Sequence, residues 1–210
     1  MDKKDKIKLI LERLEKIYPE AKTALKFETP FQLLVATILS AQTTDDRVNK
    51  VTATLFKKMP TPQDFAKASI EEIMDEIKSV NFYKNKAKNI KSCAEILINE
   101  FDGKVPNNME DLIKLPGVAR KTANIVLSEA YGINEGIAVD THVRRLAQRL
   151  GLSKNTEPEK IERDLMEITP KTRWRDISNL LILHGRKICQ AKKPKHSECV
   201  LFDICPSRDE

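Results

Sequence analysis

A lysine beside a tight turn is the first feature of this sequence with a possible chemical use. The stretch LPGVARKTANIVL, residues 115–127, places Arg120 and Lys121 directly after a Pro-Gly turn. A cation in the first turn of a helix faces the positive end of the helix dipole. With Arg120 beside it, the charged form of the Lys121 amine is disfavoured, so the amine should release its proton more readily than a free one. A neutral amine attacks carbon, which makes Lys121 a candidate nucleophile.

A carboxylate that could work with this amine occurs in the stretch IAVDTHVRRLAQRL. Asp140 has the position of a helix N-cap there, which is a structural use. An N-cap carboxylate stays ionised, so the same group could also stabilise a cationic transition state. The simpler alternative for Arg120 and Lys121 is that they only add charge that binds phosphate. The residue types alone leave both uses open.

The elements that must position these groups are predicted to be helices. Apolar residues recur at helical spacing over 7–18 and 143–150, and no alternating run is long enough to indicate a sheet. Ser69 with Glu72 has the spacing of a capping box, and Asn107 with Glu110 has that of its Asn variant. The predicted fold class is all-α.

Glycine positions divide the predicted helices. Gly151 directly follows the apolar stripe of 143–150 and is expected to end that helix. Gly117 lies in a turn between a short helix over 109–115 and a longer one whose buried stripe contains Ala123 and Val126. This arrangement is a helix-hairpin-helix, whose backbone N–H groups can hold a DNA phosphate without reading sequence.

Composition narrows the class of protein. The chain has 210 residues, 40% of them hydrophobic, and can form one large or two small domains. Its formal charge of +6 favours a polyanionic partner such as nucleic acid, which by itself is weak support. The N-terminal stretch MDKKDKIKLI lacks the apolar core of a signal peptide, and no apolar run reaches the roughly 18 residues of a membrane span. We therefore expect a cytoplasmic protein without a membrane partner, associated with the nucleoid in a prokaryote.

The cysteines are distributed unevenly. Three of the four, Cys189, Cys199 and Cys205, lie close together near the C-terminus, which in a reducing compartment indicates a metal site more than disulfides. Cys93 lies in an apolar helical stretch and is expected to be buried. His184 is expected to be packed and hydrogen-bonded instead of catalytic.

The combination of LPGVARKTANIVL and AVDTH resembles the endonuclease III family of helix-hairpin-helix DNA glycosylases. The similarity runs from LLVATILSAQTTDDRVNK to the C-terminal cysteines. It implies a monomeric base excision repair enzyme that acts on double-stranded DNA with damaged bases or abasic sites. It also implies two helical domains, residues 18–132 and residues 1–17 with 133–210.

The resemblance assigns a mechanism to the two residues already singled out. It implies that Lys121 attacks the sugar C1′, expels an oxidised pyrimidine and forms a Schiff base, after which β-elimination cuts the strand. Asp140 would stabilise positive charge on the sugar. Relatives that act on adenine or thymine mismatches carry Ser or Tyr in place of Lys121, so a lysine favours a lyase. The alternatives are a glycosylase for mismatched or alkylated bases and a non-catalytic DNA-binding protein.

Further DNA contacts follow from the resemblance. Gln42 would enter the gap left by the flipped nucleotide, and Asp45 lies on the same loop. Phe82 stands where relatives carry a leucine wedge, although it could instead be a core aromatic residue. Asn81 replaces a glycine and is expected to adopt its left-handed backbone. At the hairpin, the predicted phosphate contacts are Gly117, Val118, Ala119 and Arg120.

The metal site departs from the family pattern. The family spacing C-x6-C-x2-C-x5-C holds a [4Fe–4S] cluster, and here His196 occupies the second position. His196 could ligate iron, three cysteines could hold a labile cluster, or the Cys3His set could bind zinc. We expect the cluster, with zinc as the second choice. The intervening basic loop is expected to bind DNA phosphates through Lys192, Lys193 and Lys195.

Overall fold

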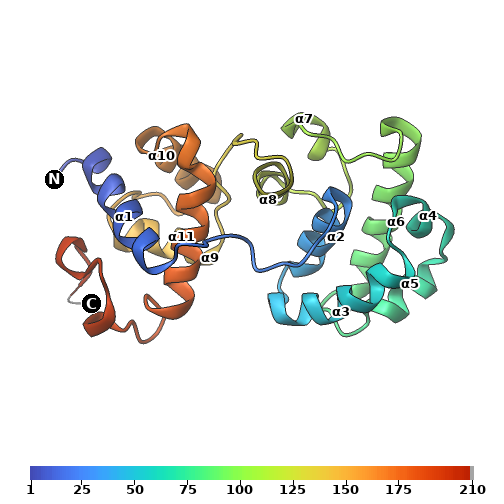
Figure 1. The fold of residues 1–210 in the computed structure, drawn as a ribbon, viewed down its shortest axis with the longest axis horizontal. Helices are drawn as coiled ribbons and strands as arrows, with labels where there is room; N and C mark the ends of the chain where they lie inside the picture. The colour runs from blue at the N-terminus through green and yellow to red at the C-terminus, as the bar shows by residue number, and fades with distance from the viewer. Residues whose placement is uncertain (209–210) are drawn as a thin grey trace. The chain divides into compact units, whose positions relative to one another are not determined.

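The computed structural model describes residues 1–208, and these form helices and loops without a strand (Figure 1). This confirms the predicted all-α class. The chain divides into two compact units. We call Thr23–Glu135 the central unit, and Met1–Lys22 with the chain from Gly136 onward the terminal unit.

The expected boundary at residue 18 lies a few residues before the observed one. The resemblance places Tyr18 at the start of the central domain, but this residue packs in the hydrophobic core of the terminal unit. Its ring lies edge-on to that of His184, with 6.3 Å between centroids. Aromatic burial of this kind ties the residue to the unit that covers it.

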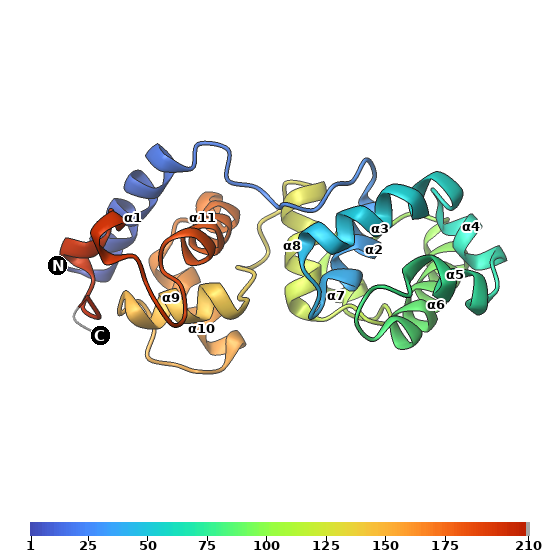
Figure 2. The same cartoon turned by 90° about the horizontal axis from the view of Figure 1, so that it is seen from below.

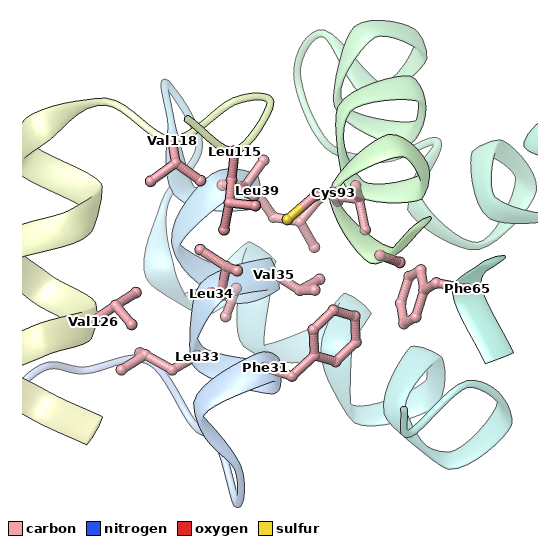
Figure 3. Packing of buried hydrophobic residues seen from close by; sticks show 14 of the residues in the cluster. Phe31, Leu33, Leu34, Val35, Leu39, Phe65, Cys93, Leu115, Val118 and Val126 are labelled. Carbon is pink, nitrogen blue, oxygen red and sulfur yellow. The ribbon is translucent and has the colours of Figure 1, made fainter. Parts of the chain in front are cut away.

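The central unit is built around one apolar helix. This helix, α2, is buried along almost its whole length and packs against α3, α6 and α8. A helix that is apolar on all sides belongs in a core. Figure 3 shows Phe31 and Leu34 of α2 among side chains from neighbouring elements, including Phe65 and Val126. The helices of this unit are α2 (Pro30–Ser40), α3 (Asp45–Lys58), α4 (Pro62–Lys67), α5 (Ile70–Ile77), α6 (Tyr83–Phe101), α7 (Met109–Leu112) and α8 (Arg120–Ala130).

The terminal unit places α11 against both α1 and α9, as Figure 2 shows from below. Gly151 follows α9 with a φ of +68°, and the next amide donates back to the Ala147 carbonyl at 2.8 Å. The predicted helix end is therefore confirmed. No helix of residues 1–208 is long and apolar enough to span a membrane. The elements are α1 (Lys3–Ile17), α9 (Thr141–Arg149), α10 (Pro158–Ile168), α11 (Trp174–Lys187) and the short 3-10 turns η1 (Lys171–Arg173), η2 (His196–Glu198) and η3 (Phe202–Ile204).

Local start signals are mostly read correctly from the sequence. The Ser69–Glu72 capping box is present at the start of α5. The box predicted at Asn107 is wrong by one residue, because Asn108 is the N-cap and accepts a hydrogen bond from the Asp111 amide at 2.9 Å. Two adjacent asparagines cannot be ranked as caps by spacing alone. The helix also ends at Leu112, before the predicted Leu115.

Candidate functional site

The hairpin turn lies close against α6. Gly117 has a φ of +78°, a left-handed conformation that favours glycine. A Cβ at this position would come within 3.1 Å of the side-chain amide nitrogen of Asn89 in α6. Leu115 and Val118 bury their side chains in the central core on either side of the turn (Figure 3). The turn is therefore held in place from both sides.

The amides of this turn are not equally available. The Val118 N–H donates to the Leu115 carbonyl at 3.1 Å, and its side chain is buried, so the predicted phosphate contact of Val118 has no free donor. In residues 1–208 the amides of Gly117 and Ala119 have no hydrogen-bond partner. Ala119 is the N-cap of α8 and makes no side-chain cap. Unpaired amides at a helix start can hold an anion.

Lys121 is the second residue of α8 and is exposed. The other face of α8 buries Ala123, Val126 and Leu127 in the central core. This packing fixes the helix start, and with it the backbone position of Lys121, beside the free amides of the turn. The sequence-predicted stripe and the exposed amine therefore lie on the same short helix.

Asp140 caps α9 in the terminal unit. Its Oδ1 accepts hydrogen bonds from the amides of His142 and Val143, both at 2.8 Å. The predicted N-cap is confirmed. Within residues 1–208 the second carboxylate oxygen has no hydrogen-bond partner. One oxygen is thus used for structure and the other is available for chemistry.

The two residues expected to enter the DNA helix share an unusual backbone. Gln42 has a φ of 54° and Phe82 a φ of 57°, both left-handed. Both side chains are exposed, Phe82 to 61%, so the alternative that Phe82 is a core aromatic residue is wrong. The expectation that Asn81 takes the left-handed conformation is also wrong, because Phe82 takes it. Asn81 instead donates its side-chain amide to the Gln42 carbonyl at 2.5 Å.

Helix α6 connects the predicted contacts of the central unit. Phe82 is its N-cap, Asn89 on it lies against the Gly117 turn, and its Lys86 holds the segment around Gln42. Asp45, the first residue of α3, is half-buried just after that segment. Sequence analysis missed Lys86, because in YKNKAKN it is one of three closely spaced lysines.

The terminal unit contains one small pocket that is lined by all four predicted metal ligands. These are Cys189, His196, Cys199 and Cys205. Within residues 1–208 no three His, Cys, Asp or Glu side chains are placed to hold a single metal ion. The pocket nevertheless brings the four residues of the C-x6-H-x2-C-x5-C spacing to one site.

We call residues 189–205, which contain the predicted ligands, the metal loop. Two arginines of α9 hold its start. Arg145 donates to the carbonyls of Gly185 and Cys189, both at 2.9 Å. Arg149 donates to the Gln190 carbonyl at 2.8 Å and lies 3.3 Å from the Cys189 sulfur. Because the last turn of a helix attracts cations and exposes carbonyls, these contacts also stabilise the end of α11.

His184 also belongs to the metal region, which sequence analysis missed. Its Nε2 lies 3.4 Å from the Cys199 sulfur, and burial lowers the pKa of the ring to about 4. It is 1% exposed, in agreement with the predicted packing. Because His184 lies only five residues before Cys189, its position in the sequence could have indicated a contact with the metal region.

The basic loop exposes all three of its predicted contacts, Lys192, Lys193 and Lys195. The Lys195 amine lies 3.7 Å from the Glu198 carboxylate. An exposed pair of this kind contributes little to stability, but it reduces the charge that a phosphate would meet.

Two family models match this chain. One is the HhH-GPD superfamily of base excision DNA repair proteins, over residues 35–171. The other is the iron-sulfur binding domain of endonuclease III, over residues 189–205. The chain belongs to the endonuclease III family. The second match confirms the expected iron–sulfur site.

Relatives of the family are similar over nearly their full length. Endonuclease III of Synechocystis is 53% identical over 205 residues, which cover 98% of this chain and 94% of the relative. Endonuclease III of Escherichia coli K12 is 40% identical over 201 residues, covering 96% and 95%. The structure of a trapped endonuclease III–DNA covalent intermediate superposes with a TM-score of 0.94 at 42% identity, covering 99% and 98%.

Proposed function

We propose that this chain removes oxidised pyrimidines from double-stranded DNA and cuts the strand at the abasic site, with Lys121 as the nucleophile. Bifunctional glycosylase and lyase activity in base excision repair is the activity of its family. The observation that carries the assignment is the exposed amine of Lys121, held on a fixed helix start beside the free amides of Gly117 and Ala119. These amides bind a phosphate of the damaged strand and bring the amine to the adjacent sugar.

The reaction proceeds in two stages. The amine lone pair of Lys121 forms a bond to C1′ while the bond from C1′ to the base breaks, and the base leaves with the bonding electrons and takes up a proton. Opening of the sugar ring converts the adduct to a protonated Schiff base. Loss of a 2′ proton and departure of the 3′ phosphate then cut the strand by β-elimination.

Asp140 stabilises the positive charge that develops on the sugar. Two backbone amides donate to its carboxylate and fix the position of this group at the start of α9. A carboxylate oriented before the reaction needs no reorganisation when the charge appears.

The cluster is held by Cys189, Cys199 and Cys205, with His196 as the fourth ligand. It supplies a cross-link that closes the C-terminal loop, as metal sites do in small domains. The closed loop presents Lys192 and Lys193 to DNA phosphates. Replacing the histidine with the family cysteine, His196→Cys, should prolong the life of the visible absorbance in air, and an unchanged lifetime would remove His196 from the ligand set.

Borohydride trapping on duplex DNA with an abasic site tests the nucleophile. The native protein should form a covalent adduct, and Lys121→Ala should form none. Lys114→Ala is the matched control, because Lys114 is an exposed lysine in the same hairpin region that pairs with Asp111. A native protein without an adduct, or an adduct that survives Lys121→Ala, would refute the assignment.

Lesion choice is tested by excision from three duplexes, which contain thymine glycol, mismatched thymine or an alkylated purine. The proposed function predicts that thymine glycol is removed fastest. Faster removal of either other base would assign the chain to a different specificity on the same scaffold.

A further inference from the structure

The central unit contains a buried lysine that the proposed chemistry does not use. Lys86 of α6 is only 6% exposed, and within residues 1–208 it is the only buried lysine. Its burial lowers its pKa to about 8, so the amine still carries its charge at neutral pH. Burying a charged group is costly unless the group is fully hydrogen-bonded. The side chain must therefore have partners that offset this cost.

All partners of the Lys86 amine belong to the segment that carries Gln42. The amine donates to the carbonyls of Leu39 at 2.8 Å and Ala41 at 2.6 Å, and lies 3.4 Å from the Thr43 hydroxyl. An ammonium group has three donors, which matches these three acceptors. The carbonyls belong to the end of α2, where a positive charge is favoured. The amine thus holds the residues on both sides of Gln42.

The same residue also anchors the turn of Phe82. The backbone amide of Lys86 donates to the Phe82 carbonyl at 3.1 Å at the start of α6. The side chain of Asn81 then joins the two turns directly, by donating to the Gln42 carbonyl at 2.5 Å. Gln42 and Phe82 are therefore connected through Asn81, just before α6, and Lys86, in its first turn.

These bonds explain how two residues other than glycine keep left-handed backbones. Such a conformation is strained and persists where the surroundings impose it. The Lys86 and Asn81 contacts impose it on Gln42 and Phe82 in the free protein. Segments that are already ordered lose less entropy on binding.

We propose that Lys86 is a positioning residue that holds Gln42 and Phe82 as one preformed unit for insertion into the DNA helix at the flipped nucleotide. This role rests on the proposed function, since the inserted pair serves to keep the damaged nucleotide out of the stack. Lys86 itself contacts the protein and not the DNA. Without it, the two side chains would have to be ordered during binding, and the gap in the duplex would be filled less often.

The test uses a DNA duplex with 2-aminopurine opposite a tetrahydrofuran abasic analogue. Insertion unstacks the 2-aminopurine, so its fluorescence should rise when native protein binds. Lys86→Met should lower the population of the inserted state by about tenfold, the effect expected when a charged group loses its hydrogen bonds. The fluorescence at saturating protein should then stay near that of free DNA.

A lysine on the same helix provides the matched control. The Lys91 amine also donates hydrogen bonds to two carbonyls at the end of α4, those of Ala66 at 2.6 Å and Ala68 at 2.8 Å. Lys91→Met removes a similar contact but leaves the Gln42 segment intact, so it should keep the native fluorescence rise. Thermal unfolding of both variants compares their general loss of stability.

A second variant covers the case that Lys86→Met does not fold. Asn81→Ala changes an exposed residue and removes only the bond to Gln42, so it should also reduce the rise. A native-sized rise in folded Lys86→Met or in Asn81→Ala, or no rise with native protein, would overturn the inference. Lys121→Ala should keep the rise while losing the borohydride adduct, which separates the failure of this inference from the failure of the proposed nucleophile.

Discussion

Two loops of this molecule are held by basic side chains, but in different ways. In the central unit the Gln42 segment is held by Lys86, a buried lysine with three acceptors around it. In the terminal unit the metal loop is held at its start by Arg145 and Arg149, which are only partly buried. The remainder of that loop contains two turns of three residues each, η2 and η3.

The difference indicates when each loop acquires its shape. The Gln42 segment needs no cofactor to reach its conformation, because a neighbouring helix supplies hydrogen-bond partners to its strained backbone. Most backbone bonds of the metal loop close only short turns within it, such as those of the Cys199 amide to His196 and the Cys205 amide to Phe202, and its four ligand residues line a shared pocket. We infer that the first loop is ordered on folding, whereas the second is ordered by the cluster.

Removal of the cluster should have the largest effect and should act on one unit only. In Cys199→Ala the loop loses a ligand, so trypsin should cut it rapidly after Lys192 or Lys195. The segments around Gln42 and Phe82 should keep their native resistance, because their supports lie in the central unit. Limited proteolysis followed by mass spectrometry measures both rates. Equal sensitivity of the two loops would break the comparison.

The second largest effect should come from replacing the basic side chains that hold the two loops, Lys86 and Arg149. Lys86→Met leaves buried carbonyls without donors and should lower the free energy of unfolding by about 1–3 kcal/mol. Arg149→Met exposes its carbonyls to water, which can replace the bonds, so its loss should be under about 1 kcal/mol. Urea unfolding of the two variants beside the native protein gives both values. A larger loss for Arg149→Met would reverse the order inferred from burial.

The hairpin glycine should show a smaller effect that separates backbone strain from contact. Gly117 and Gly132 both have left-handed backbones, at +78° and +68°, but only Gly117 has a neighbour within 4 Å of an added Cβ. Each change to alanine should cost about 1 kcal/mol from strain. Gly117→Ala should lose more, because Asn89 must also shift, and it should weaken binding to undamaged duplex DNA. Equal losses in stability would show that α6 does not constrain the turn.

The smallest expected effect at neutral pH concerns the ionisation of Cys93, in the core of the central unit. Burial raises the pKa of its thiol to about 12 from an ordinary value of 9.0. Above pH 9 the thiol ionises in the unfolded chain but not in the folded one, so rising pH favours unfolding. Cys93→Ala removes this contribution and should show a shallower loss of stability between about pH 9 and 11. Parallel curves for the two proteins would contradict the predicted burial effect.

Local features could be read from the sequence because nearby residues satisfy them. The Asp140 and Ser69 caps bind amides two or three residues away, and Gly151 ends a helix through its own backbone. The spacing of the C-terminal ligands and the hairpin stripe are also local patterns. The predictions for Lys121 and Gln42 also rest on short motifs of neighbouring residues.

Only the tertiary structure decided which basic and aromatic residues are buried. The Lys86 amine meets carbonyls 45 and 47 residues earlier in the chain, and the His184 ring meets a sulfur 15 residues later. Phe82 could have been a core residue by composition, but a left-handed helix start leaves it exposed. Periodicity reports the face of a helix, not which distant segment will cover it, so contacts of this kind follow from the packing of the whole unit.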